Sequence, residues 1–92
     1  MKQAIGIIEA KGLITLIEAS DAALKSANIQ MTGYEKIGSG IVTGFFTGDV
    51  AAIKAGLDAA AAAGNRVGQI LATKVIPRPH DDLSKLAATL PQ

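Results

Sequence analysis

The middle of the chain, residues 29–47, most constrains the possible fold, because its pattern indicates two strands joined by a tight turn. Apolar and polar residues alternate over residues 29–36 with the period of two that is typical of a half-buried strand. Residues 41–47 are rich in β-branched residues and phenylalanine, which favour a second strand. Gly38 and Gly40 flank Ser39 between them, and glycine readily adopts the positive φ of a hairpin turn. We therefore predict an antiparallel hairpin.

Before the hairpin, the sequence predicts one strand and one helix. Residues 3–10 form a short apolar run with three isoleucines, which indicates a strand buried on both faces. After Gly12, one face of a predicted helix carries apolar and small residues at helical spacing, namely Leu13, Leu16, Ile17, Ser20, Leu24 and Ala27. Asp21 and Lys25 stand four residues apart on another face, in the favourable order for an ion pair.

After the hairpin, a second helix and a fourth strand are predicted. Asp49 is suited to cap a helix over residues 50–64, whose alanine run allows close packing. Residues 67–76 form the strand, which two prolines at positions 77 and 79 terminate. We expect one short helical turn around residues 83–87 and a frayed tail over residues 86–92.

The order strand, helix, strand, strand, helix, strand predicts an α+β fold of the ferredoxin-like, split β-α-β type. In this arrangement, a four-stranded antiparallel sheet carries both helices on one face. The 92 residues fit a single domain spanning residues 1–92. This fold supports many unrelated activities, so it does not define the function.

Composition excludes several classes of function. The chain is 49% apolar but only 3% aromatic, so its small core leaves apolar surface that we expect other copies to cover. A net charge of +1 without a basic run argues against a nucleic-acid partner. Because no apolar run approaches the ~18 residues of a membrane span, we expect a soluble, cytoplasmic protein without a membrane partner.

The sequence offers no set of residues of the kind that forms a catalytic, metal or cofactor site. Cysteine is absent and His80 is the single histidine, so we expect no metal site and no catalytic residue. The Gly38-Ser39-Gly40 turn does not match a dinucleotide fingerprint, because Thr43 stands where the third glycine is needed and a strand follows. We therefore expect no cofactor and no enzymatic activity.

Several segments together resemble the shell proteins of bacterial microcompartments, and they cover almost the whole chain in order. The resemblance is greatest to the single-domain, hexamer-forming class of the propanediol-utilisation type, while ethanolamine-utilisation and carboxysome tiles are related. The segments that carry it are residues 6–9 (GIIE), 11–13 (KGL), 18–22 (EASDA), 25–28 (KSAN), 33–40 (GYEKIGSG), 47–50 (TGDV) and 75–80 (VIPRPH).

The resemblance implies a homohexamer that tiles with neighbouring hexamers and other shell proteins into the facets of a shell. Such a shell lies in the cytoplasm and encloses enzymes. The loop between the second and third strands would line a central pore for small polar metabolites, through Lys36, Ile37, Gly38, Ser39 and Gly40. The resemblance also implies contacts between hexamer edges through Lys25, Asn28, Arg78 and His80.

One alternative function remains open on sequence alone. Ferredoxin-like domains often sense small molecules at subunit interfaces, so a small-molecule-binding regulatory module is the second hypothesis. Departures from the family pattern at Ala10, Thr47 and Lys74 leave open which compartment the chain belongs to.

Overall fold

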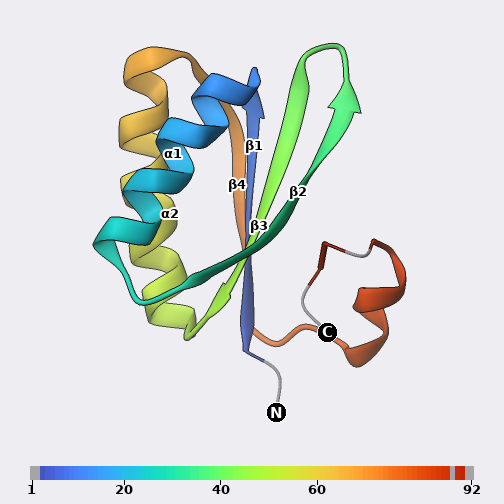
Figure 1. Cartoon of the computed structure of the whole chain (residues 1–92). Coiled ribbons are helices and arrows are strands. Elements are labelled where there is room, and N and C mark those ends of the chain that lie inside the picture. Colours follow the sequence, from blue (N-terminus) through green and yellow to red (C-terminus); the bar gives the residue numbers. More distant parts are fainter. Residues whose placement is uncertain (1–2, 88, 91–92) are drawn as a thin grey trace.

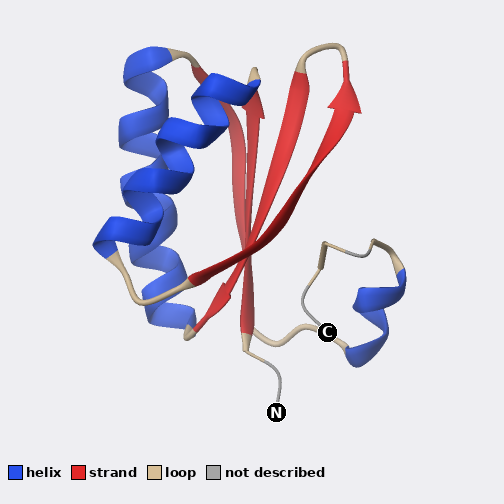
Figure 2. Cartoon of the chain, in the orientation of Figure 1, coloured by secondary structure: helices blue, strands red, loops and turns tan. Residues whose placement is uncertain are grey.

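The chain folds into one antiparallel sheet covered on one face by two helices (Figures 1 and 2). The structure, a computed structural model, describes residues 3–87, 89 and 90. The sheet has the order β2-β3-β1-β4, with every neighbouring pair antiparallel, and thus confirms the ferredoxin-like prediction. The elements are β1 (Ala4–Lys11), α1 (Leu13–Ser26), β2 (Gln30–Gly38), β3 (Ile41–Gly48), α2 (Val50–Val67), β4 (Gln69–Ile76) and a 3-10 turn η1 (Asp81–Lys85).

The core lies between the helices and the sheet and is built from few large side chains. Phe46, Ile8, Leu16 and Ile53 are essentially inaccessible to water. The two helices approach each other over small residues: a Cβ added to Gly64 would lie 3.2 Å from the Cβ of Ala19. The alanine-rich stretch of α2 therefore packs closely, as its composition predicts.

The hairpin between β2 and β3 turns at Ser39 and Gly40. Gly38 pairs with Ile41, and the two residues between them have φ of 55° and 78°. Positive φ at both central residues is the geometry that matches the right-handed twist of the flanking strands. The predicted hairpin is therefore confirmed.

The predicted alternation of β2 is wrong in one respect, because the strand contains bulges. Met31 pairs with Phe46 and Gly33 with Phe45, so Thr32 has no partner residue on β3. This extra residue reverses the side on which the next side chains project, as far as a second shift of register between Lys36 and Gly38. Met31 and Tyr34, which alternation places on opposite faces, consequently line the same groove beside α1.

The ends of α2 differ from the prediction. Asp49 occupies the predicted N-cap position, although its carboxylate accepts no capping hydrogen bond. Its main-chain carbonyl instead accepts the first helical bond from the amide of Ile53, at 2.8 Å. The helix continues past the predicted end at Gly64 to Val67. The missing side chain at Gly64 leaves room for Ile70 of β4 to pack directly against the helix.

The C-terminal segment returns to the sheet on the face opposite the helices (Figure 1). The hydroxyl of Thr32 donates to the carbonyl of Thr89 at 2.7 Å, and the hydroxyl of Thr89 donates to the carboxylate of Glu35 at 2.6 Å. Leu90 is buried. The frayed tail expected for residues 86–92 is thus wrong for residues 89 and 90, while residues 88, 91 and 92 lie outside the described part. The predicted helical turn is present, two residues earlier than expected.

Replacing Gly33 with alanine is expected to destabilise the fold by about 1–3 kcal/mol more than the same change at Gly12. Both glycines have positive φ, 151° and 86°, but only a Cβ at Gly33 would meet another residue, 2.8 Å from the Cγ2 of Thr89. Urea unfolding at matched protein concentration measures the difference. Combining Gly33→Ala with Thr89→Gly should restore most of the extra loss of stability. If Gly33→Ala destabilises the fold equally with and without the Thr89 side chain, the contact between the C-terminal segment and β2 is contradicted.

Candidate functional site

The residues predicted to line a pore form the exposed tip of the β2–β3 hairpin. All five, from Lys36 to Gly40, are exposed. The amide of Gly12 donates to the carbonyl of Gly40 at 2.7 Å, which fixes the tip to the start of α1. The tip therefore presents a hydroxyl, glycine backbone and one lysine on a defined turn.

Three of the four residues predicted at a hexamer edge gather at the other end of the sheet. Lys25 is in the last turn of α1, and Asn28 follows it, with its carbonyl 3.4 Å from the position of a Cβ on Gly48. Arg78 lines a depression of about 480 Å³ that also includes Gly48 and Asp49. Asn28 and Arg78 thus lie at the end of the sheet opposite the hairpin tip, which is at the top of Figure 1.

His80, the fourth predicted edge residue, has a local structural role. Its Nδ1 accepts a hydrogen bond from the amide of Asp82 at 3.0 Å, so the side chain caps η1. The sequence analysis did not anticipate this cap, although two acids directly after a histidine are compatible with a helix start.

Lys25 is held by a neighbouring carboxylate, as the helical spacing predicts. Its ammonium lies 2.8 Å from a carboxylate oxygen of Asp21. The hydrogen bond to Asp21, followed by the charge of Asp21, raises the pKa of Lys25 above its ordinary value of 10.5. Lys25 is therefore charged at neutral pH, and the small contribution that it makes to stability through this exposed pair is lost as the pH rises through its raised pKa.

Features that would indicate other functions are missing from the described part of the chain. Among residues 3–87, 89 and 90, no three side chains of the metal-binding types lie together. Within the same residues, no helix combines the length and the apolar character needed to cross a membrane.

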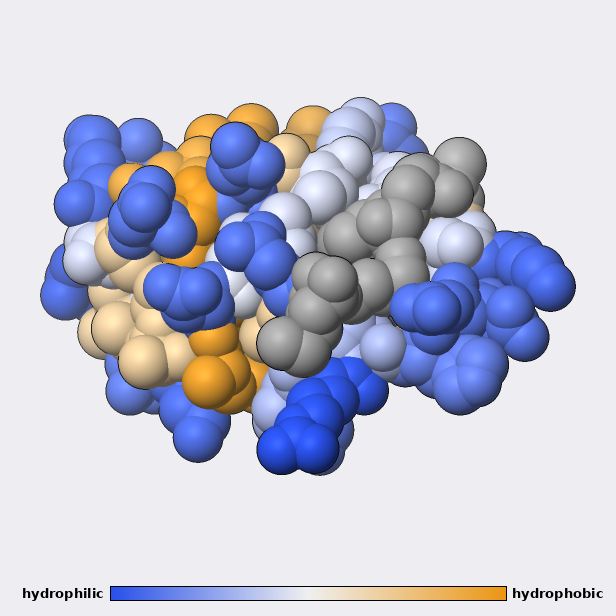
Figure 3. All heavy atoms as spheres, turned by 90° about the horizontal axis from the view of Figure 1, so that it is seen from below, coloured by the Kyte–Doolittle hydropathy of each residue, from blue (hydrophilic) through white to orange (hydrophobic). Residues whose placement is uncertain are grey.

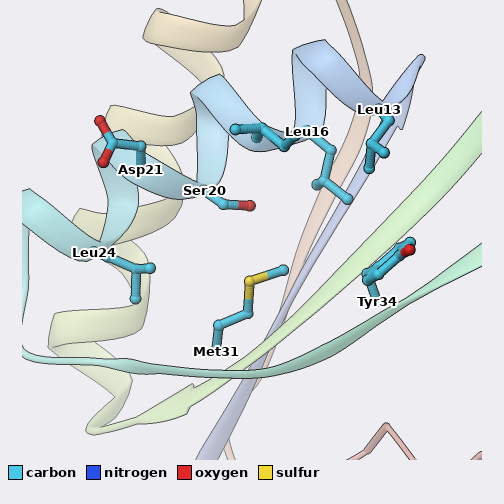
Figure 4. A pocket seen from close by; sticks show the side chains of 8 residues that line it. Leu13, Leu16, Ser20, Asp21, Leu24, Met31 and Tyr34 are labelled. Carbon is cyan, nitrogen blue, oxygen red and sulfur yellow. The ribbon is translucent and has the colours of Figure 1, made fainter.

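A groove between α1 and β2 is the feature that sequence reasoning missed (Figure 4). It has a volume of about 400 Å³, and its lining is mostly apolar: Leu13, Leu16, Ile17, Ser20, Asp21, Leu24, Met31 and Tyr34. The helical spacing had identified the α1 residues as a face to be buried. In the folded chain, however, Leu13, Ile17 and Leu24 stay substantially exposed.

Comparison with known proteins connects this geometry with a family. A sequence model of the BMC domain matches residues 4–79. The chain belongs to the BMC family of bacterial microcompartment shell proteins. The resemblance seen in the sequence is thereby confirmed.

Relatives of this BMC protein come from several kinds of compartment. The shell protein PduA of Citrobacter freundii is 55% identical over 92% of this chain and 91% of its own length. The shell protein EutM of Escherichia coli K12 is 50% identical over 91% and 87% of the respective chains. The carboxysome shell protein CcmK2 of Synechocystis is 45% identical over 90% and 82%. These relatives are structural shell proteins and not enzymes.

A solved structure supports the fold. A microcompartment protein from Desulfitobacterium hafniense superposes with a TM-score of 0.81 at 26% sequence identity. The match covers 100% of this chain and 51% of the other, so the BMC protein described here spans about half of that structure's length.

Proposed function

We propose that this shell protein forms cyclic hexamers that tile into the facets of a microcompartment, with the hairpin tips around a central pore. The observation that carries the proposal is the placement of the two predicted contact regions. The tip around Ser39 and the region of Asn28 and Arg78 lie at opposite ends of one sheet (Figure 1). If six tips converge on an axis, the Arg78 ends point outward, where neighbouring hexamers meet.

The chemistry of the tip suits the passage of small polar molecules. Glycines at positions 38 and 40 allow six backbones to approach closely, and Ser39 supplies a hydroxyl that donates and accepts without charge. Lys36 adds positive potential near the opening. A small polar metabolite can exchange its hydration for such groups, whereas a large cofactor would be excluded by size.

The outer end suits contacts between hexamers and with other shell proteins. The end of the molecule seen from below carries hydrophilic side chains with apolar ones between them (Figure 3), a mixture that can be solvated before tiling and covered afterwards. The chain bends at Pro77 and Arg78, directly after β4, and Arg78 is exposed, so its long donor side chain can reach a neighbour. The inner surface of the finished shell would face the enclosed enzymes.

Negative-stain electron microscopy of the purified full chain tests this function. We expect extended sheets with hexagonal order, tubes or closed shells. Discrete small oligomers whose melting temperature shifts with a metabolite would instead support the regulatory module that the sequence left open.

A further inference from the structure

The C-terminal segment holds β2 at one short stretch, on the sheet face opposite the helices (Figure 1). The hydroxyl of Thr32 donates to the carbonyl of Thr89 at 2.7 Å, and the hydroxyl of Thr89 donates to the carboxylate of Glu35 at 2.6 Å. Gly33, between them, leaves the space that the methyl group of Thr89 occupies, since a Cβ there would lie 2.8 Å from it. Thr89 thus contacts three residues of β2 that lie close together.

The stretch that Thr89 holds lies between two shifts of register in the β2–β3 pairing. One shift follows Met31, and the other lies between Lys36 and Gly38. Each shift leaves one residue of β2 without a partner on β3, so the strand departs from regular pairing twice. Thr32 is the residue left out at the first shift, and its hydroxyl is the group that bonds to the C-terminal segment. The bulge and the C-terminal segment therefore meet at the same place.

Regular pairing would give the hairpin a different tip. Met31 pairs with Phe46, so five further steps along both strands would bring Lys36 opposite Ile41. The turn between the strands would then contain four residues in place of two. A four-residue turn is most often built on negative φ, so it would relieve Ser39 of its present φ of 55°. Regular pairing would also return the unpaired residue of the bulge to the ladder.

The register of β2 is fixed by a neighbouring strand on one side only. β2 lies at the edge of the sheet, where β3 is its single strand partner. A shift by one residue turns each side chain to the other face, so regular pairing would point Glu35 toward the face that carries the helices. Its carboxylate can bind Thr89 only in the observed register. The two contacts of Thr89 consequently favour the bulged pairing over the regular one.

We propose that the C-terminal segment is a clamp that fixes the register of the β2–β3 hairpin, and that its release lets β2 slip toward regular pairing and lengthens the tip. Leu90, which is buried, anchors the clamp next to Thr89. Thr89 and Glu35 are positioning residues: they lie outside the tip itself, but they determine where Ser39 is held.

The consequence for the pore rests on the function proposed above. Six turns of four residues would surround the axis with longer loops than six turns of two. A molecule that binds the C-terminal segment away from the sheet would shift the population toward the slipped register, because it binds only the released state. The clamp thus connects one face of the tile with the opening at its centre.

Engineered cysteine pairs report the register directly, because the chain has no cysteine of its own. Lys36→Cys with Ile41→Cys brings two sulfurs opposite each other only after the slip. In the observed register, position 36 pairs with Val42, and the side chain of its neighbour Ile41 projects from the other face. Mass spectrometry in a glutathione buffer measures the intrachain disulfide. Gln30→Cys with Thr47→Cys is the control pair, because these positions precede the bulge and face each other in both registers.

Substitutions of threonine in this background test the clamp. Thr89→Val keeps the shape of the side chain and should raise the ratio of the 36–41 disulfide to dithiol about tenfold, because a hydrogen bond to a carboxylate is lost. Adding Thr32→Val should raise it further. Thr89→Ser keeps the hydroxyl and should return the ratio to its starting value, and Thr73→Val, the same change at an exposed position of β4, should leave it unaltered. A ratio that stays at its starting value in the chain with both valines would overturn the clamp.

The disulfide reads pairing within one chain, so its result does not depend on the assembly of tiles. If the ratio responds as expected but the unmodified chain forms no hexagonal sheets, tubes or shells, the clamp stands and the tile function is overturned. If tiles form and the ratio does not respond, the clamp is overturned and the tile function stands. Circular dichroism checks that the variants remain folded.

Discussion

Arg78→Ala is expected to abolish extended sheets while leaving soluble hexamers intact. Arg78 is exposed, and within residues 3–87, 89 and 90 it forms no ion pair, so its guanidinium remains available to another molecule. The five donors of a guanidinium can satisfy several carbonyl or carboxylate acceptors at once. Repeated at every edge of every hexamer, the loss of these contacts should shift the assembly equilibrium from sheets to free rings.

Size-exclusion chromatography with light scattering measures the hexamer, and negative-stain microscopy measures the sheet. Arg78→Lys keeps the charge but loses the planar set of donors, and should restore sheets only in part. Lys25→Ala should also remove sheets, whereas Lys54→Ala, an exposed lysine of α2, serves as the matched control. Sheets that persist in both Arg78→Ala and Lys25→Ala would count against the edge assignment.

The order and topology of the elements could be predicted because they follow from periodicity. The spacing of apolar residues gives the two helices, and the glycine turn around Ser39 defines the central hairpin. Once the hairpin is in place, the helix between the first two strands leaves few ways to arrange the sheet. The predicted ferredoxin-like order required no knowledge of side-chain contacts.

The bulge in β2 could not be predicted in the same way. Alternation assumes that each residue of one strand pairs with one residue of the next strand. The sequence pattern gives no sign that Thr32 is left out of this pairing. Gly33, with φ of 151°, was counted as a regular strand position. Strict alternation therefore places Tyr34 on the face opposite Met31, and it gives no sign of the groove that the two side chains line together.

A sequence also does not show what covers an apolar helix face in the folded protein. The spacing of Leu13, Ile17 and Leu24 shows that this face avoids water, but it does not show whether the same chain or another copy covers it. Contacts across long separations are similarly hidden: Thr32 and Thr89 are 57 positions apart, and only the folded backbone brings them together.

Ser39→Leu is expected to reduce the permeation of small polar metabolites about tenfold without preventing assembly of the shell. Ser39 is exposed at the hairpin tip, so its side chain takes no part in the core. Six leucines around an axis would form a narrow apolar ring, which water and polar solutes enter poorly. A solute that loses one hydrogen bond at this point pays roughly 1–1.5 kcal/mol, which corresponds to about tenfold in rate.

The backbone of this turn calls for a control, because Ser39 has φ of 55°. Leucine is strained there by about 1–2 kcal/mol, whereas asparagine and glycine accept positive φ readily. Ser39→Asn enlarges the side chain but keeps it polar, and Ser39→Gly removes it. Flux through intact shells, measured as the turnover of an enclosed enzyme on an external substrate, should fall with leucine, change less with asparagine and hold or rise with glycine. If flux were unchanged in Ser39→Leu shells of normal appearance, metabolites would be crossing elsewhere, and the hairpin tip would be a structural turn alone.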